Sequence, residues 1–178
     1  MSTDFIALFD VTLEVVTAEW LLENLASNPK FAAEIVEQYR DHWRPKTWAI
    51  AIKESPDGPA VYGPGGFAIR LRPRTLELYH MMRFSTFTAD SSSRDVLRRA
   101  CLTVTELVGS ARAIYTHELM PHDGEGLSQI ESGLRTHIAP PAATFAELNA
   151  ADYFKPYAWY IDTFSDFRGC GNTNHPTR

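Results

Sequence analysis

The residue types best suited to chemistry lie close together in one polar stretch, residues 117–123. His117, Glu118, His122 and Asp123 are all able to bind a metal ion or exchange a proton. The spacing departs from the zinc-binding pattern H-E-x-x-H, because the second histidine comes one residue late and side chains five positions apart diverge on a helix. Pro121 favours a loop, in which the four side chains can still converge on a metal with a further ligand from elsewhere.

Two hypotheses follow for this stretch. In one, the chain is a small metal-assisted hydrolase, in which the metal lowers the pKa of a bound water and a carboxylate accepts its proton. In the other, residues 117–123 form a solvated loop after a strand. The second is the commoner outcome for so short a motif, so we predict no catalytic residue, no metal and no cofactor.

Two glycine-containing motifs are incomplete. Residues 63–68 match the letters G-x-G-x-x-A, but they precede an alternating strand and not the helix that a dinucleotide site requires, so we predict a turn. Residues 126–130 lack the second glycine of a nucleophile elbow, and Ser128 is expected to cap or open a helix.

The isolated histidine and cysteines favour structural roles. His80 falls on the apolar parity of its strand and is predicted to be a core histidine bonded to the backbone. Cys101 lies within an apolar helical stripe and is expected in the core. Cys170 and His175 are only two ligands on a polar tail, so no zinc site is predicted there.

A surface for binding another protein is the stronger candidate. Arginine and tyrosine are enriched at binding hot spots. They recur on one parity of the mid-chain strands, and tryptophan belongs to a dense aromatic group near the C-terminus. The predicted partner-binding residues are Tyr62, Arg70, Arg72, Tyr79, Arg83 and Trp159. The alternative is a solvated outer sheet face on which Glu77 balances the arginines.

The elements that must position these residues follow from hydrophobic periodicity and turn chemistry. Strands are predicted at residues 5–16, 48–53, 61–62, 67–72, 76–85, 111–116 and 157–164. Helices are predicted from Thr17, from 28–29 to before Pro45, over 96–108 with Gly109 as the stop, over 127–138, and from a capping box at 144–147. This order predicts an α+β fold with an antiparallel or mixed central sheet and helices packed on one face. Residues 1–168 are expected to form a single domain and 169–178 an irregular tail.

Composition and charge exclude several classes. The chain of 178 residues is 44% hydrophobic and 22% charged, which is globular composition, and its net charge is −5. A nucleic-acid partner is not expected without a basic surplus. No apolar run reaches the length of a membrane span. Two cysteines and a start without signal-peptide character lead us to expect a cytoplasmic protein.

The second half of the chain resembles small acidic α+β immunity proteins of bacterial toxin–immunity systems. The resemblance covers about half of the chain, at 94–99, 113–115, 134–135, 140–148 and 157–162. It implies a non-enzymatic protein that binds and neutralises a toxin domain, which the negative charge would help to steer onto a basic partner. A structural subunit that associates with itself is a further alternative to the binding protein and the hydrolase.

Overall fold

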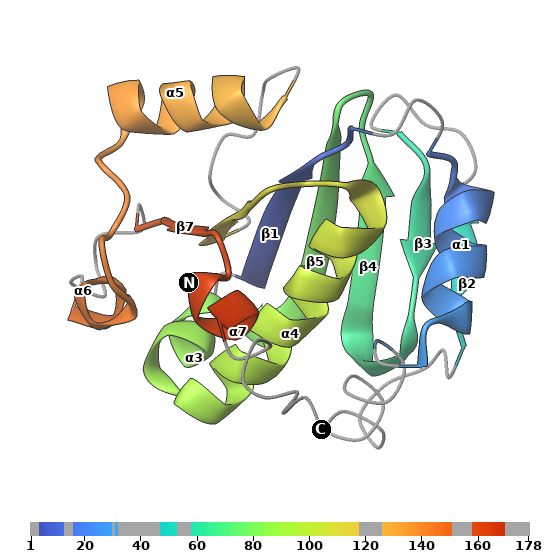
Figure 1. Cartoon of the computed structure of the whole chain (residues 1–178), viewed down its shortest axis with the longest axis horizontal. Coiled ribbons are helices and arrows are strands. Elements are labelled where there is room, and N and C mark those ends of the chain that lie inside the picture. The colour runs from blue at the N-terminus through green and yellow to red at the C-terminus, as the bar shows by residue number, and fades with distance from the viewer. Residues whose placement is uncertain are drawn as a thin grey trace, which may run out of the picture.

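The computed structural model describes residues 4–12, 16–29, 31, 47–52, 58–117, 126–150 and 158–169. They form one seven-stranded sheet in the order β2-β3-β4-β5-β1-β6-β7. Every strand pair in it is antiparallel. The strands are β1 Asp4–Asp10, β2 Ala49–Ile52, β3 Ala60–Tyr62, β4 Phe67–Leu71, β5 Thr75–Arg83, β6 Ala113–His117 and β7 Tyr160–Asp162. With the helices around the sheet (Figure 1), this confirms the predicted α+β fold.

The helices are α1 Ala18–Ser27, α3 Phe84–Ala89, α4 Ser91–Val108, α5 Leu127–His137, α6 Phe145–Ala150 and α7 Ser165–Gly169, with a 3-10 turn at Pro64–Gly66. The caps predicted at Thr17, Gly109 and Thr144 are confirmed, whereas α5 begins after Gly126 without a side-chain cap. Asp90 accepts bonds from the backbone N–H groups of Ser92 and Ser93 at the start of α4. Gly109 ends α4 in the left-handed region, at φ 71°, where glycine is favoured.

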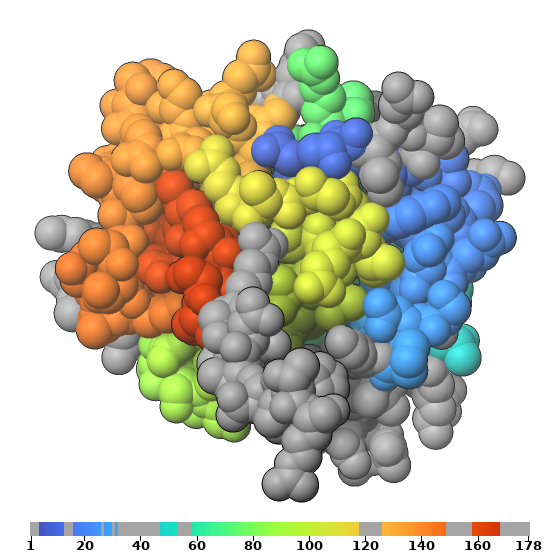
Figure 2. Space-filling view, viewed as in Figure 1, coloured from blue at the N-terminus to red at the C-terminus, as the bar shows by residue number. Residues whose placement is uncertain are grey.

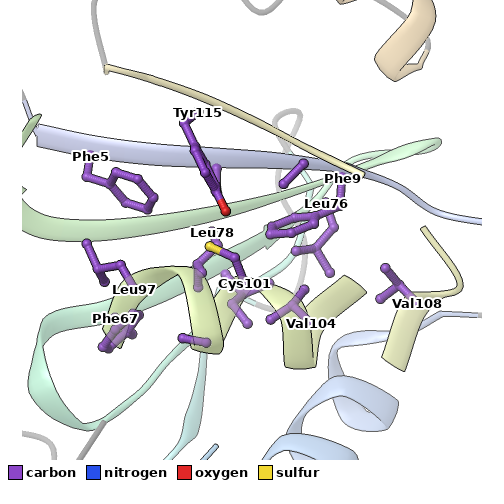
Figure 3. Close-up of a cluster of buried hydrophobic side chains, with 14 of the residues drawn as sticks. Phe5, Phe9, Phe67, Leu76, Leu78, Leu97, Cys101, Val104, Val108 and Tyr115 are labelled. Atoms are coloured by element: carbon purple, nitrogen blue, oxygen red, sulfur yellow. The ribbon is translucent and has the colours of Figure 1, made fainter. Parts of the chain in front are cut away.

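One face of the sheet packs against α4 and forms the main core (Figure 3). Alternation brings every second residue of β1, β5 and β6 to this face, and the buried stripe of α4 lies opposite. Figure 3 shows members of this cluster from both sides: the strands of the sheet contribute Phe5, Phe9, Phe67, Leu76, Leu78 and Tyr115, and α4 contributes Leu97, Cys101, Val104 and Val108. Cys101 is fully buried, as predicted. Figure 2 views the molecule from this side, where β7 and α7 lie between α6 and α4.

The opposite face of the sheet is covered over β1 and β6 by α5. The alternate residues of these strands form a second buried cluster with α5 and Trp159. The strands contribute Ile6, Leu8 and Ile114, and α5 contributes Leu127, Ile130 and Leu134. Helices therefore pack on both faces, beyond the single apolar face expected from the sequence. No helix among the described residues is both long and apolar enough to cross a membrane.

Several elements differ from the predicted boundaries. The first strand ends at Asp10, and β5 ends at Arg83, where α3 begins. The six residues of α3 are rich in aromatic and β-branched types that favour strands, but burial of Phe84 and Phe87 stabilises the helix. The last strand is only residues 160–162, and α7 was not predicted. Most of the helix expected before Pro45 and the tail after Gly169 lie outside the described residues.

His80 is a core histidine bonded to the backbone, as predicted. Its Nδ1 accepts a hydrogen bond from the Met82 backbone N–H at 3.0 Å, and its Nε2 lies 3.0 Å from the Gly65 carbonyl oxygen. The neutral ring protonated at Nε2 satisfies both contacts, because a proton on Nδ1 would face another N–H group. Burial lowers the pKa of His80 to about 4, against smaller opposing effects of the Gly65 bond and the Asp4 charge.

This geometry predicts a defined pH dependence of stability. The unfolded chain takes up a proton on this histidine near pH 6.5, whereas the folded chain does so only near pH 4. The neutral His80 side chain therefore contributes fully to the free energy of unfolding above pH 6.5. This contribution, about 3 kcal/mol, is lost as the pH falls from 6.5 to 4. Urea unfolding across this pH range should show a smaller decrease in the free energy of unfolding for His80→Gln than for the wild type. Equal losses in the two proteins would contradict the assignment.

Candidate functional site

The candidate site is the part of the second sheet face that lies over β3, β4 and β5. The strand register places Tyr62, Ala68 and Tyr79 side by side across these strands. Arg70 lies two residues along β4, opposite Glu77 on β5. We call the surface formed by Tyr62, Ala68, Arg70, Tyr79 and Met81 the open sheet face. The register agrees with the parity predicted for Arg70 and Tyr79, and with a place for Tyr62 beside them.

Two large apolar side chains are exposed on the open sheet face. Tyr62 is 46% exposed and Met81 is 40% exposed. Only small residues separate them: Ala68 lies opposite Tyr62, and a Cβ atom on Gly66 would stand 3.4 Å from the Met81 sulfur. The thioether thus lies over a glycine, and the surface between the two side chains is low and apolar.

Arginines border this apolar surface. The Arg72 guanidinium contacts the Glu77 carboxylate at 3.4 Å, and Glu77 is nearly buried. Arg72 Nε and Glu77 Oε2 are buried with no hydrogen-bond partner in the described structure. Within it, Arg72 therefore keeps a donor, and Glu77 an acceptor, that the ion pair does not use. Arg70 is half-buried opposite Glu77, and Arg83 is exposed opposite Asp4 at the end of β5. Neither arginine forms an ion pair with a described acidic residue.

Tyr79 is held in place by a polar contact. Its hydroxyl donates a hydrogen bond to Asp4 Oδ2 from the neighbouring strand β1. The half-buried ring packs against the edge of the cluster under α5. Tyr79 therefore joins the covered and uncovered parts of the same sheet face, with its phenol oriented by Asp4.

Trp159 does not belong to an exposed surface, which corrects the sequence prediction. Its side chain is fully buried in the cluster under α5, and its Nε1 donates to the Ala139 carbonyl oxygen at 2.9 Å. The guanidinium of Arg135 lies 5.7 Å from its ring centroid. The aromatic residues near the C-terminus thus include one that packs beneath α5 and is not exposed. Burial of the indole N–H is tolerated because the Ala139 carbonyl oxygen accepts its hydrogen bond.

The residues of the metal hypothesis are only partly described. His117 is buried at the end of β6, and its ring centroid lies 5.9 Å from that of Phe84. Glu118, His122 and Asp123 lie outside the described residues. Within the described part of the chain, no three His, Cys, Asp or Glu side chains are grouped to hold a metal ion.

A buried ion-pair network, which the sequence analysis missed, joins α4 to the C-terminal elements. Arg98 Nε donates to Asp162 Oδ2 at 2.7 Å, and Arg98 NH2 contacts Asp166 Oδ1 at 2.7 Å. The Tyr115 hydroxyl donates to the same Asp162 oxygen at 2.9 Å. In the helical pattern of α4, Arg98 lies beside the apolar stripe, which by itself indicates no buried partner. The available signal was Asp162, a lone carboxylate in an aromatic and β-branched strand.

This network stabilises the charged form of Arg98, and it does not lower the pKa of a neighbouring nucleophile. Burial raises the pKa of the Tyr115 hydroxyl and of the Cys101 thiol, so both keep their protons. Figure 3 shows the Tyr115 hydroxyl pointing toward the Cys101 sulfur. Burial disfavours the charge on Arg98, but hydrogen bonds to Asp166 and Asp162 outweigh it and raise the pKa of Arg98. The network therefore has a structural role.

In comparisons with protein-family models, with curated proteins and with solved structures, the chain matches none of them.

Substitution of Arg98 should lower the free energy of unfolding strongly. Arg98→Met leaves the buried Asp162 carboxylate without its cation, so we expect a loss of about 3–5 kcal/mol in the free energy of unfolding. The control is Arg135→Met, which removes an exposed ion pair to Glu131 and should cost no more than about 1 kcal/mol. Urea titrations of both variants test this. Similar small losses would show that the buried pair contributes little.

Proposed function

We propose that the chain is a non-enzymatic protein-binding module that contacts its partner through the open sheet face. One observation carries the proposal. Tyr62 and Met81, the two exposed large hydrophobic side chains among the described residues, lie on this same face with small residues between them.

The composition of this surface supports binding of a protein. Interfaces are enriched in Tyr, Met and Arg, with an apolar centre and a polar rim. On the open sheet face, Tyr62 and Met81 lie on either side of Ala68 and Gly66. Arg70 and Arg72 follow along the chain at one end, and Arg83 ends β5 at the other. Scattered single apolar residues are ordinary on a protein surface, whereas a contiguous apolar patch with a polar rim marks an interaction site. Tyrosine and arginine are also enriched among the residues that contribute most to binding.

The architecture also suits binding without rearrangement. The strands that carry the open sheet face are hydrogen-bonded in register, and their other side packs on the main core. Tyr79 is oriented by its bond to Asp4. A surface that is already ordered loses little conformational entropy when a partner binds, so more of the contact energy appears as affinity.

We propose a toxin domain as the partner, following the resemblance to immunity proteins. The net charge of −5 supports steering toward a partner of positive net charge over long distances. Local contacts on the open sheet face then decide the orientation of docking.

The test is affinity capture with the tagged chain, followed by quantitative mass spectrometry of the bound proteins. The double variant Tyr62→Ala/Met81→Ala should lose at least tenfold in captured partner, because truncation at the centre of an interface typically costs 2 kcal/mol or more. Its unfolding free energy should change by less than about 1 kcal/mol, since both side chains are exposed.

The matched control is Thr136→Ala/His137→Ala on the exposed end of α5. It should capture the partner as the wild type does. If the captured protein is a toxin domain, expressing that protein alone should arrest growth, and co-expression of the chain should restore it. Equal capture by wild type and Tyr62→Ala/Met81→Ala would refute binding through this face.

A further inference from the structure

We infer that the part of the partner that docks on the open sheet face is acidic, with carboxylates placed next to an apolar side chain. This inference rests on the proposed function and deepens it. It is not what the charge of the whole chain suggests, because a chain of net charge −5 would by itself favour a basic partner.

The first observation is the local charge of the sequence that builds this surface. Residues 58–76 contain no aspartate or glutamate, and they contain Arg70, Arg72 and Arg74 within five positions. These arginines lie at the end of β4 and in the turn that joins it to β5. One end of the open sheet face is therefore positively charged on an otherwise acidic chain.

The second observation is how little of this positive charge is neutralised. Among the described residues, Glu77 pairs with Arg72 alone, at 3.4 Å. Arg70 and Arg74 have no described acidic partner, and Arg72 Nε has no hydrogen-bond acceptor there. Of the acidic residues near the other end of the face, Asp4 already accepts the Tyr79 hydroxyl. Against the described residues, the arginine end therefore has donors without an acceptor, and such donors fit carboxylate oxygens.

The third observation is the position of the apolar side chains relative to these donors. Tyr62 pairs with Ala68, and Arg70 is two residues further along the same strand, on the same face. Two residues of a strand span about 7 Å. A partner side chain that packs on Tyr62 therefore lies within reach of carboxylates bound by Arg70, and Arg83 offers a second cation beyond Met81.

The geometry favours a protein partner over a polyanion. Nucleic acids bind through many phosphates to an extended basic surface, and their affinity would be reduced by the negative charge of the remaining chain. This surface has a short arginine cluster beside an apolar centre. An acidic segment with an aromatic or aliphatic anchor fits both features.

The experiment is selection of phage-displayed random peptides on three immobilised proteins. These are the wild type, Arg70→Gln/Arg74→Gln, and the control Arg99→Gln/Arg135→Gln, which removes the same charge from exposed residues of α4 and α5. Wild type and control should enrich peptides that combine Asp or Glu with an aromatic or aliphatic residue. A synthetic selected peptide should bind Arg70→Gln/Arg74→Gln at least about tenfold more weakly, and its affinity for the wild type should fall with added salt.

The outcomes separate this inference from the function on which it rests. Each selected peptide is also measured against Tyr62→Ala/Met81→Ala. Peptides that lose affinity for this variant but are basic or uncharged, or that bind the three selection proteins equally, would overturn the acidic partner and leave the binding function standing. Failure to enrich any peptide that depends on Tyr62 would count against the binding face itself. Tighter binding of a short duplex DNA than of acidic peptides, lost in Arg70→Gln/Arg74→Gln, would also overturn the inference.

Discussion

The arrangement of the C-terminal elements depends on the buried ion pair between Arg98 and Asp162. Asp162 accepts hydrogen bonds from Arg98, from the Tyr115 hydroxyl and from the Phe164 backbone N–H, so its two oxygens are fully used. Desolvation of two charges is expensive, and it is offset only where every polar atom has a partner. Here Arg98 also lies over the rings of Phe145 and Phe167. The pair thereby joins α4 to β7, α6 and α7.

The uncovered surface follows from how the two sheet faces are filled. The α4 side is closed by the main core, and α5 with Trp159 closes β1 and β6 on the other side. Tyr62 and Met81 remain exposed over β3 to β5. The strands beneath them are anchored by the same core that α4 completes, so a rigid scaffold presents an apolar centre with arginines beside it. That combination, rather than any catalytic group, is the most specific chemical feature of the described residues.

Much of the fold could be predicted from local patterns. The stripe of α4, its Gly109 stop and the alternation of β4 and β5 depend on neighbours in sequence. The same alternation predicts that Arg70 and Tyr79 share one face, as the register confirms. The predictions that were wrong or missing concern residues whose environment depends on contacts far away in the sequence. Trp159 is buried by α5, α3 is helical because Phe84 and Phe87 are buried, and Arg98 is paired with Asp162 across 64 positions. No periodicity within a window reports such partners.

The most direct measurement of the central claim is hydroxyl-radical footprinting of the chain with and without its captured partner. Tyr62 and Met81 are reactive residue types and are exposed in the unbound chain. We expect the partner to lower their modification several-fold, while exposed residues at the end of α5, such as His137, are modified as before. Unchanged modification of Tyr62 and Met81, with protection elsewhere on the chain, would contradict binding through the open sheet face.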